Sequence, residues 1–167
     1  MNLGATIVGI VIVGLCIIPF ILISANSRKK KERLLQGLFG LAQKNKGKIS
    51  RYDLWNNSTT GIDDTAHTIF FTRKVKETET LQMIHLAEVQ KCRVINSGRA
   101  VRQTVGNHHV IEKLELEFAY WDKVKTATVL EFYNTDSDSL TLTGELQLAE
   151  KWNKIVNDFL SAIPLQK

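Results

Sequence analysis

The chain has 167 residues, with 22 Lys and Arg, 17 Asp and Glu, and a formal net charge of +5. This length fits one domain of ordinary size plus a short additional segment. Residues 1–50 hold eight basic residues and one acid, whereas the remainder holds 14 basic and 16 acidic residues. A nucleic-acid-binding domain needs a basic face of its own, so this distribution argues against that class.

The stretch from Leu3 to Ser24 contains 22 consecutive residues without a charge. A helix of that length covers roughly 33 Å, about the thickness of a bilayer's hydrocarbon core. The alternative is a signal peptide, which has a positive n-region, a shorter apolar core and a small-x-small cleavage site. Only Met1 and Asn2 precede the apolar stretch. We therefore predict an uncleaved transmembrane anchor over residues 1–26.

The orientation of this anchor follows from its flanking charges. All the neighbouring Lys and Arg residues lie on its C-terminal side, and such residues concentrate on the cytoplasmic side of a membrane. We expect a single-pass protein of the cell (inner or plasma) membrane, with its N-terminus outside and its domain in the cytoplasm. Export of the domain is the alternative. The two cysteines, Cys16 and Cys92, form no disulfide framework, which fits a reducing compartment.

Residues 27–47 follow the apolar stretch and are called the basic collar here. Leu34, Leu38 and Leu41 recur at helical spacing, which predicts an amphipathic juxtamembrane helix that runs to about Asn45 and is closed by Gly47. The candidate membrane-surface residues, for topology or for contact with anionic lipid, are Arg28, Lys29, Lys30, Lys31 and Arg33. The apolar side of this helix either lies along the inner leaflet or packs on the protein's own domain. Both interpretations can hold together.

From residue 48 to residue 167 the pattern becomes strand-like. We expect strands at 48–56, 68–72, 81–86, 89–95, 110–121 and 126–133, with turn residues at 57–61, 96–98 and 122–125. The alternation is clearest in 110–121, where one face is apolar and the other is charged. A sheet that faces water on one side is antiparallel.

A C-terminal helix over residues 144–163 closes this domain. Leu146, Ala149, Trp152, Val156 and Phe159 recur at intervals of three and four, and Trp152 and Phe159 are expected to fill the core against the sheet. The expected fold class is therefore α+β: an N-terminal transmembrane helix, the juxtamembrane helix, and a small antiparallel sheet or barrel capped by a C-terminal helix.

This order of elements resembles the bacterial pleckstrin-homology-like (PH-like) domain over residues 48–164. The run from Ile84 to Val94 is similar to a strand-turn-strand unit of that family, and Gly61–Asp64 with Ile69–Phe71 suits the same layout. The resemblance implies a PH-like barrel that acts as a binding or scaffold module. Members that bind lipid headgroups carry a basic cluster in the first strand-strand turn, where this chain has the uncharged residues 56–59. That difference argues against phosphoinositide recognition, because Lys91, Arg93, Arg99 and Arg102 come later in the chain.

No residue pattern predicts a catalytic site, a metal site or a cofactor. The four histidines, His67, His85, His108 and His109, lack the spacing of metal ligands. Asp63 and Asp64 are adjacent but have no accompanying base or nucleophile, and Cys92 lies among apolar strand residues as a buried thiol would.

The segment from Asn134 to Glu145 places oxygen-bearing side chains at several positions of a calcium-binding loop, including Asp136, Asp138 and Glu145. It starts with Asn and has Ser139 where the sharp turn needs Gly, so an acidic turn before the last helix is the preferred interpretation.

The leading functional hypothesis is a membrane-tethered, non-catalytic interaction or scaffold module without a cofactor. Its expected partners are the lipid bilayer, anionic lipid at the basic collar, and a protein of unknown identity, with no nucleic acid. The alternative hypothesis is a calcium-dependent sensor or a membrane-bound enzyme that uses Asp136, Asp138 and Glu145.

Overall fold

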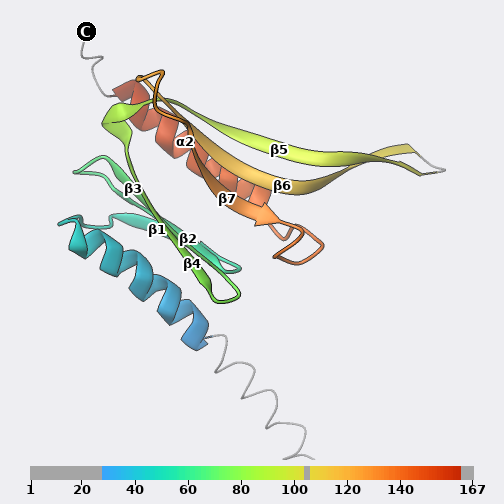
Figure 1. Cartoon of the computed structure of the whole chain (residues 1–167), viewed down its shortest axis with the longest axis horizontal. Coiled ribbons are helices and arrows are strands. Elements are labelled where there is room, and N and C mark those ends of the chain that lie inside the picture. The colour runs from blue at the N-terminus through green and yellow to red at the C-terminus, as the bar shows by residue number, and fades with distance from the viewer. Residues whose placement is uncertain (1–27, 104–105, 163–167) are drawn as a thin grey trace, which may run out of the picture.

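A computed structural model describes residues 28–103 and 106–162 of the chain. The predicted anchor at 1–26 lies outside these ranges. Among the described residues, no helix combines the length and the apolar character that crossing a membrane requires. The described part is an α+β structure with two antiparallel sheets and a C-terminal helix (Figure 1). The α+β class, the antiparallel pairing and the C-terminal helix were expected from the sequence, whereas the division into two sheets was not.

The first sheet is a four-stranded meander in the order β1-β2-β3-β4, and the second has the order β5-β6-β7. A helix over residues 28–44, called the collar helix here, precedes the first sheet. The elements of the two sheets and the C-terminal helix are β1 (Arg51–Trp55), β2 (Ser58–Asp63), β3 (Thr68–Val75), β4 (Thr78–His85), the short 3₁₀ helix η1 (Leu86–Glu88), β5 (Val89–Gln103), β6 (Gly106–Tyr120), β7 (Thr128–Asn134) and α2 (Glu145–Ala162).

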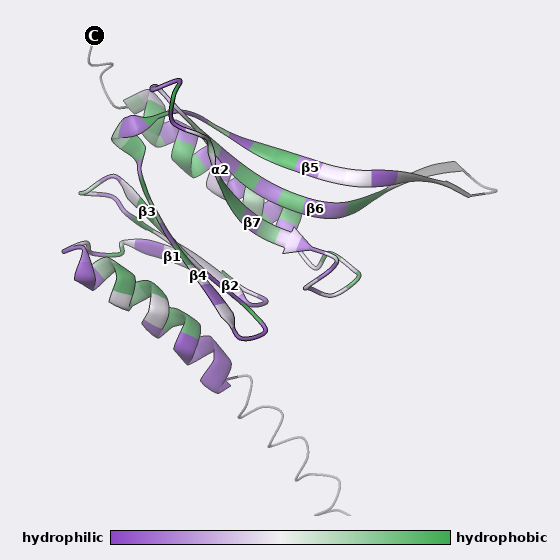
Figure 2. Cartoon of the chain, viewed as in Figure 1, coloured by the Kyte–Doolittle hydropathy of each residue, from purple (hydrophilic) through white to green (hydrophobic). Residues whose placement is uncertain are grey.

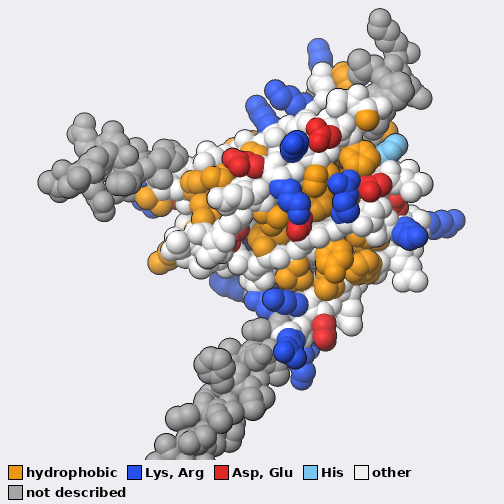
Figure 3. Space-filling model, turned by 180° about the vertical axis from the view of Figure 1, so that it is seen from behind, with side chains coloured by type: hydrophobic (Ala, Val, Ile, Leu, Met, Phe, Trp, Pro, Cys, Tyr) orange, Lys and Arg blue, Asp and Glu red, His pale blue; other side chains and the backbone are white. Residues whose placement is uncertain are grey.

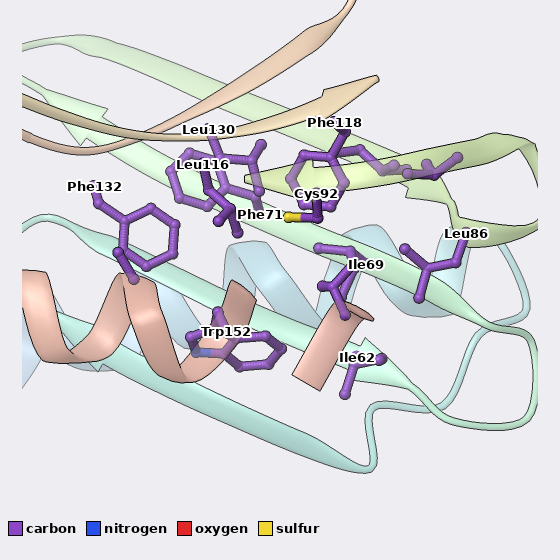
Figure 4. Packing of buried hydrophobic residues seen from close by; sticks show 14 of the residues in the cluster. Ile62, Ile69, Phe71, Leu86, Cys92, Leu116, Phe118, Leu130, Phe132 and Trp152 are labelled. Atoms are coloured by element: carbon purple, nitrogen blue, oxygen red, sulfur yellow. The ribbon is translucent and has the colours of Figure 1, made fainter. Parts of the chain in front are cut away.

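The main core lies between the two sheets and is closed by α2 (Figures 1 and 4). Trp55 of the first sheet stacks on Phe132 of the second with a centroid separation of 4.5 Å. Trp152 of α2 is 1% exposed within the same cluster, whereas Phe159 packs against it only partly buried. The predicted apolar face of β6 is confirmed, because its four apolar residues are buried: Leu114, Leu116, Phe118 and Tyr120.

The collar helix covers the outer face of the first sheet, and its polar residues lie mainly in its first turns and again at its last turn (Figures 1 and 2). Leu34 and Leu38 are buried, and Leu38 packs on Phe70 of β3. The helix ends near the predicted point, where the Gly47 N–H donates to the Ala42 carbonyl at 2.8 Å. The packing interpretation of the apolar side is therefore confirmed.

The turn predicted at 57–61 is confined to Asn56 and Asn57, and the turn predicted at 96–98 is wrong. Ser58 begins β2, a central strand buried along its whole length between the collar helix and the main core. Its threonines satisfy their hydroxyl groups on backbone carbonyls, since Thr59 donates to Asp53 at 2.9 Å and Thr60 to Phe70 at 3.3 Å. Residues 96–98 lie inside β5, where the register with β6 shifts between Ser97 and Gly98. Residues typical of turns are tolerated in both strands because pairing with neighbouring strands supplies the backbone hydrogen bonds.

Gly61 of β2 lies directly under the collar helix, with no room for a side chain. A Cβ atom at this position would lie 3.0 Å from Ile49 and 3.1 Å from the Leu38 side chain. We expect Gly61→Val to lower the free energy of unfolding by about 1–3 kcal/mol through overpacking and to loosen the collar helix.

A methyl group at Gly40 would have no neighbour within 4 Å, so Gly40→Ala is expected to stabilise the helix by up to about 1 kcal/mol. Denaturant unfolding, with hydrogen exchange over residues 28–44, measures both effects. Unchanged exchange in Gly61→Val would contradict the docking of the helix.

Candidate functional site

A groove with a volume of about 690 Å³ lies between the first turns of the collar helix and the hairpin that joins β3 to β4. Its basic side chains come from segments about 40 residues apart in the chain and are Lys29, Lys30, Arg33, Lys74 and Lys76. Among the described residues, Glu79 is the one acidic side chain in its lining, and Leu34 is a buried apolar residue there. This feature is called the basic groove below. Lys and Arg side chains gather at this end of the molecule in Figure 3.

The hairpin places its two lysines through the alternation of strand residues. Successive side chains of β3 point to opposite faces, so Arg73 enters the interior while Lys74 lies on the groove side. The Lys74 N–H donates to the Asn57 carbonyl at 2.8 Å, which joins this strand to the turn between β1 and β2. Lys76 has a φ of 55° in the two-residue turn, a conformation that usually selects Asn or Gly.

The basic groove has a positive electrostatic potential because its Lys and Arg side chains lack acidic partners. Seven Lys and Arg residues elsewhere in the described ranges have an acidic oxygen within 4.0 Å. Within the described residues, none of the five basic side chains that line the groove has an acidic oxygen within 4.0 Å. Five cations beside one carboxylate create a positive field that attracts anions.

Only three of the five basic residues of this site were predictable from the sequence. Lys29, Lys30 and Arg33 were predicted at the membrane surface and do line the basic groove, while Arg28 and Lys31 are exposed outside its lining. Lys74 and Lys76 were missed. In the sequence, these two lysines are recognisable only by their Lys-x-Lys spacing next to a short turn. That spacing does not predict that the collar helix packs beside them.

Arg73 forms a buried ion pair on the opposite face of β3. Its guanidinium is 4% exposed and bonds the carboxylate of Asp138, itself 1% exposed, at 2.8 Å. Ser58 accepts a second bond at 2.8 Å, and Glu131 lies at 3.1 Å. Since Asp138 follows β7, the pair connects the first sheet to the end of the second.

The acidic segment before α2 is held by contacts within the protein. Asp138 is paired with Arg73, and the Glu145 carboxylate accepts from the Asn56 side-chain amide at 2.6 Å. Burial of Glu145 raises its pKa, but hydrogen bonds from its own backbone, from Thr143 and from Asn56 outweigh burial, so the pKa is below its usual value. Asp136 is exposed. Within residues 28–103 and 106–162, no three His, Cys, Asp or Glu side chains are grouped as a metal site requires.

The remaining candidate residues, Cys92, Asp63 and Asp64, are buried or bonded to other groups of the protein. Burial raises the pKa of the Cys92 thiol to about 12, with the Glu117 carboxylate adding to the shift, so Cys92 is an unreactive thiol at neutral pH. Asp63 accepts backbone N–H bonds from Ala66 and Lys48, which hold its pKa below the ordinary value. Asp64 pairs with Arg51 at 2.9 Å.

The histidines and the later basic residues do not converge on the basic groove. His85 shares a hydrogen bond of 3.1 Å with Thr68, and His67 lies against the Phe159 ring. The side chains of His108, His109 and Arg102 lie outside the described part of the chain. Of the remaining basic residues, Arg93 pairs with Glu117 and Arg99 with Glu112, while Lys91 is exposed on β5.

Comparison with known proteins found no matching family model, no matching curated protein and no matching solved structure.

Proposed function

We propose that this chain is a membrane-tethered, non-catalytic interaction module. The observation that carries the proposal is the docked collar helix, which buries Leu34 and Leu38 on the first sheet while its basic side chains remain outside. The uncharged stretch from Leu3 to Ser24 lies immediately upstream. A helix fixed in this way leaves little slack between a membrane anchor and the folded domain.

The order of elements supports a PH-like identity for residues 48–162. A four-stranded meander is followed by three further antiparallel strands and one C-terminal helix that closes the core. The resemblance noted in the sequence implies the same order. Such domains serve more often as binding or scaffold modules than as enzymes, which favours an interaction role for this chain.

The proposed orientation puts the domain in the cytoplasm, with the basic collar next to the inner face of the membrane. Tethering has a physical consequence of its own, since it raises the effective concentration of the domain for any partner at the same membrane. The partner we propose is a second membrane-associated protein.

The calcium hypothesis is the competing function, and the contacts of its residues weigh against it. Binding would have to separate Asp138 from the Arg73 guanidinium and Glu145 from the Asn56 amide. A metal that binds only the folded protein raises its melting temperature. We expect no increase in the melting temperature of the full-length protein at millimolar calcium, and a clear increase would favour the sensor.

Membrane fractionation of the full-length protein tests the tether, and protease digestion of intact cells tests its direction. We expect the protein in the membrane fraction after a high-salt wash, with residues 28–162 protected from external protease. Replacement of Lys29, Lys30 and Lys31 by Glu is expected to disturb orientation or yield, because the positive flank sets topology. Release of the full-length protein by high salt would contradict the anchor, and digestion from outside would contradict the cytoplasmic location.

A further inference from the structure

We infer that the basic groove binds the phosphate-bearing headgroup of an anionic membrane lipid such as phosphatidylglycerol. The inference rests on the proposed tether, and it adds a binding groove for the headgroup and two residues, Lys74 and Lys76, that the collar sequence does not contain. The membrane-facing surface would then consist of two elements, the collar helix and the β3–β4 hairpin.

The chemistry of the groove selects an anion of modest size. Its volume of about 690 Å³ lies in the range of roughly 300–1,000 Å³ that is typical of small-molecule sites. Lysine ammonium groups bind phosphate oxygens as point charges, and arginine adds a planar pair of donors. Leu34 lies in the lining beside these cations, but at 3% exposure it adds little apolar surface, so the groove accommodates the charged headgroup and not the acyl chains.

The position of the groove in the chain favours a lipid over a free phosphate. Lys29 follows Ser24 by five residues, so even a fully extended connection is at most roughly 18 Å long. If residues 3–24 span the bilayer, the groove is within reach of the headgroup layer, where anionic lipids are concentrated. Proximity to the membrane does not favour the binding of a free phosphate, which is dissolved throughout the surrounding water.

The conformation of Lys76 is a second observation on the hairpin. Asn and Gly adopt a positive φ at lower cost than lysine in a two-residue turn, yet this position carries a lysine at φ 55°. The Lys74 backbone is in turn fixed by its bond to Asn57. The backbone positions of both lysines are therefore fixed by a tight hairpin before a ligand arrives.

Lipid titration of the full-length protein in neutral detergent tests the inference, with bound lipid counted by native mass spectrometry. The probes are short-chain phosphatidylglycerol, short-chain phosphatidylcholine and inorganic phosphate. The main variant is Lys74→Gln/Lys76→Asn, in which Asn suits the positive φ of the turn. Its control is Lys123→Gln/Lys154→Gln, which removes the same charge from exposed positions outside the groove. The basic residues of the collar helix stay unchanged, so the predicted topology signal is preserved.

We expect phosphatidylglycerol to bind the Lys74/Lys76 variant about thirtyfold more weakly than the unchanged protein, with the control within about twofold of it. Phosphatidylcholine should bind weakly throughout. Glu79→Gln removes the acidic residue of the lining and should tighten phosphatidylglycerol binding severalfold, a gain that misfolding cannot imitate.

Equal binding of phosphatidylglycerol to the Lys74/Lys76 variant and to its control would overturn the inference. Inorganic phosphate that binds as tightly as phosphatidylglycerol and displaces it would overturn the lipid as the source of the ligand. Both outcomes leave the tether untouched, because fractionation and protease protection measure the anchor separately.

Discussion

Replacement of Arg73 by Met is expected to lower the free energy of unfolding by about 3–5 kcal/mol, because it leaves a buried carboxylate without its cation. Asp138 is 1% exposed and receives the Arg73 guanidinium at 2.8 Å. The methionine replaces the volume of the arginine stem but none of its hydrogen bonds. Denaturant unfolding followed by tryptophan fluorescence measures the loss.

The double variant Arg73→Met/Asp138→Asn is the control for this prediction. Removal of both charges eliminates the unpaired carboxylate, so the double variant should be more stable than Arg73→Met alone, with a coupling energy of about 0.5–3 kcal/mol. Asp138→Asn alone should cost less than Arg73→Met, since Glu131 lies 3.1 Å from the guanidinium and remains as a partner. Strictly additive effects of the two single changes would show that the pair does not hold the sheets together.

Local periodicity explains which parts of the fold were predictable. The alternation of Leu114, Leu116 and Phe118 in β6, and the spacing of Ala149 and Trp152 in α2, depend only on the geometry of one element. Burial of these residues confirms both predictions. The same is true of the collar helix, whose leucines are spaced for one face.

Contacts between distant segments account for what the sequence did not reveal. β2 resembles a turn in composition and is a central strand only because the collar helix covers one of its faces and the main core the other. Asp138 looked like a ligand of a calcium loop, but its partner is Arg73, 65 residues earlier in the chain. The basic groove likewise depends on the register that brings Lys74 and Lys76 beside the collar helix. Pairing and register are tertiary properties that single-element periodicity does not encode.

Replacement of Trp152 by Ala is expected to cost about 3–5 kcal/mol of stability, the usual range for loss of a buried tryptophan. The side chain is 1% exposed between the sheets, and its indole N–H donates to Asp53 of β1 at 2.9 Å. Lys151 pairs with the same carboxylate at 2.6 Å, so α2 is held to the first sheet by both packing and charge.

Trp152→Phe separates these two contributions, because phenylalanine keeps much of the ring volume and loses the N–H donor. We expect Trp152→Phe to lower the free energy of unfolding by less than Trp152→Ala does. The control is Trp121→Ala, which should change stability by no more than about 0.5 kcal/mol, since Trp121 is 50% exposed. Thermal unfolding compares the three variants. A Trp152→Ala protein as stable as Trp121→Ala would mean that α2 does not close the core. A large loss in Trp152→Ala with little loss in Trp121→Ala is the result expected if the packing of α2 closes the core.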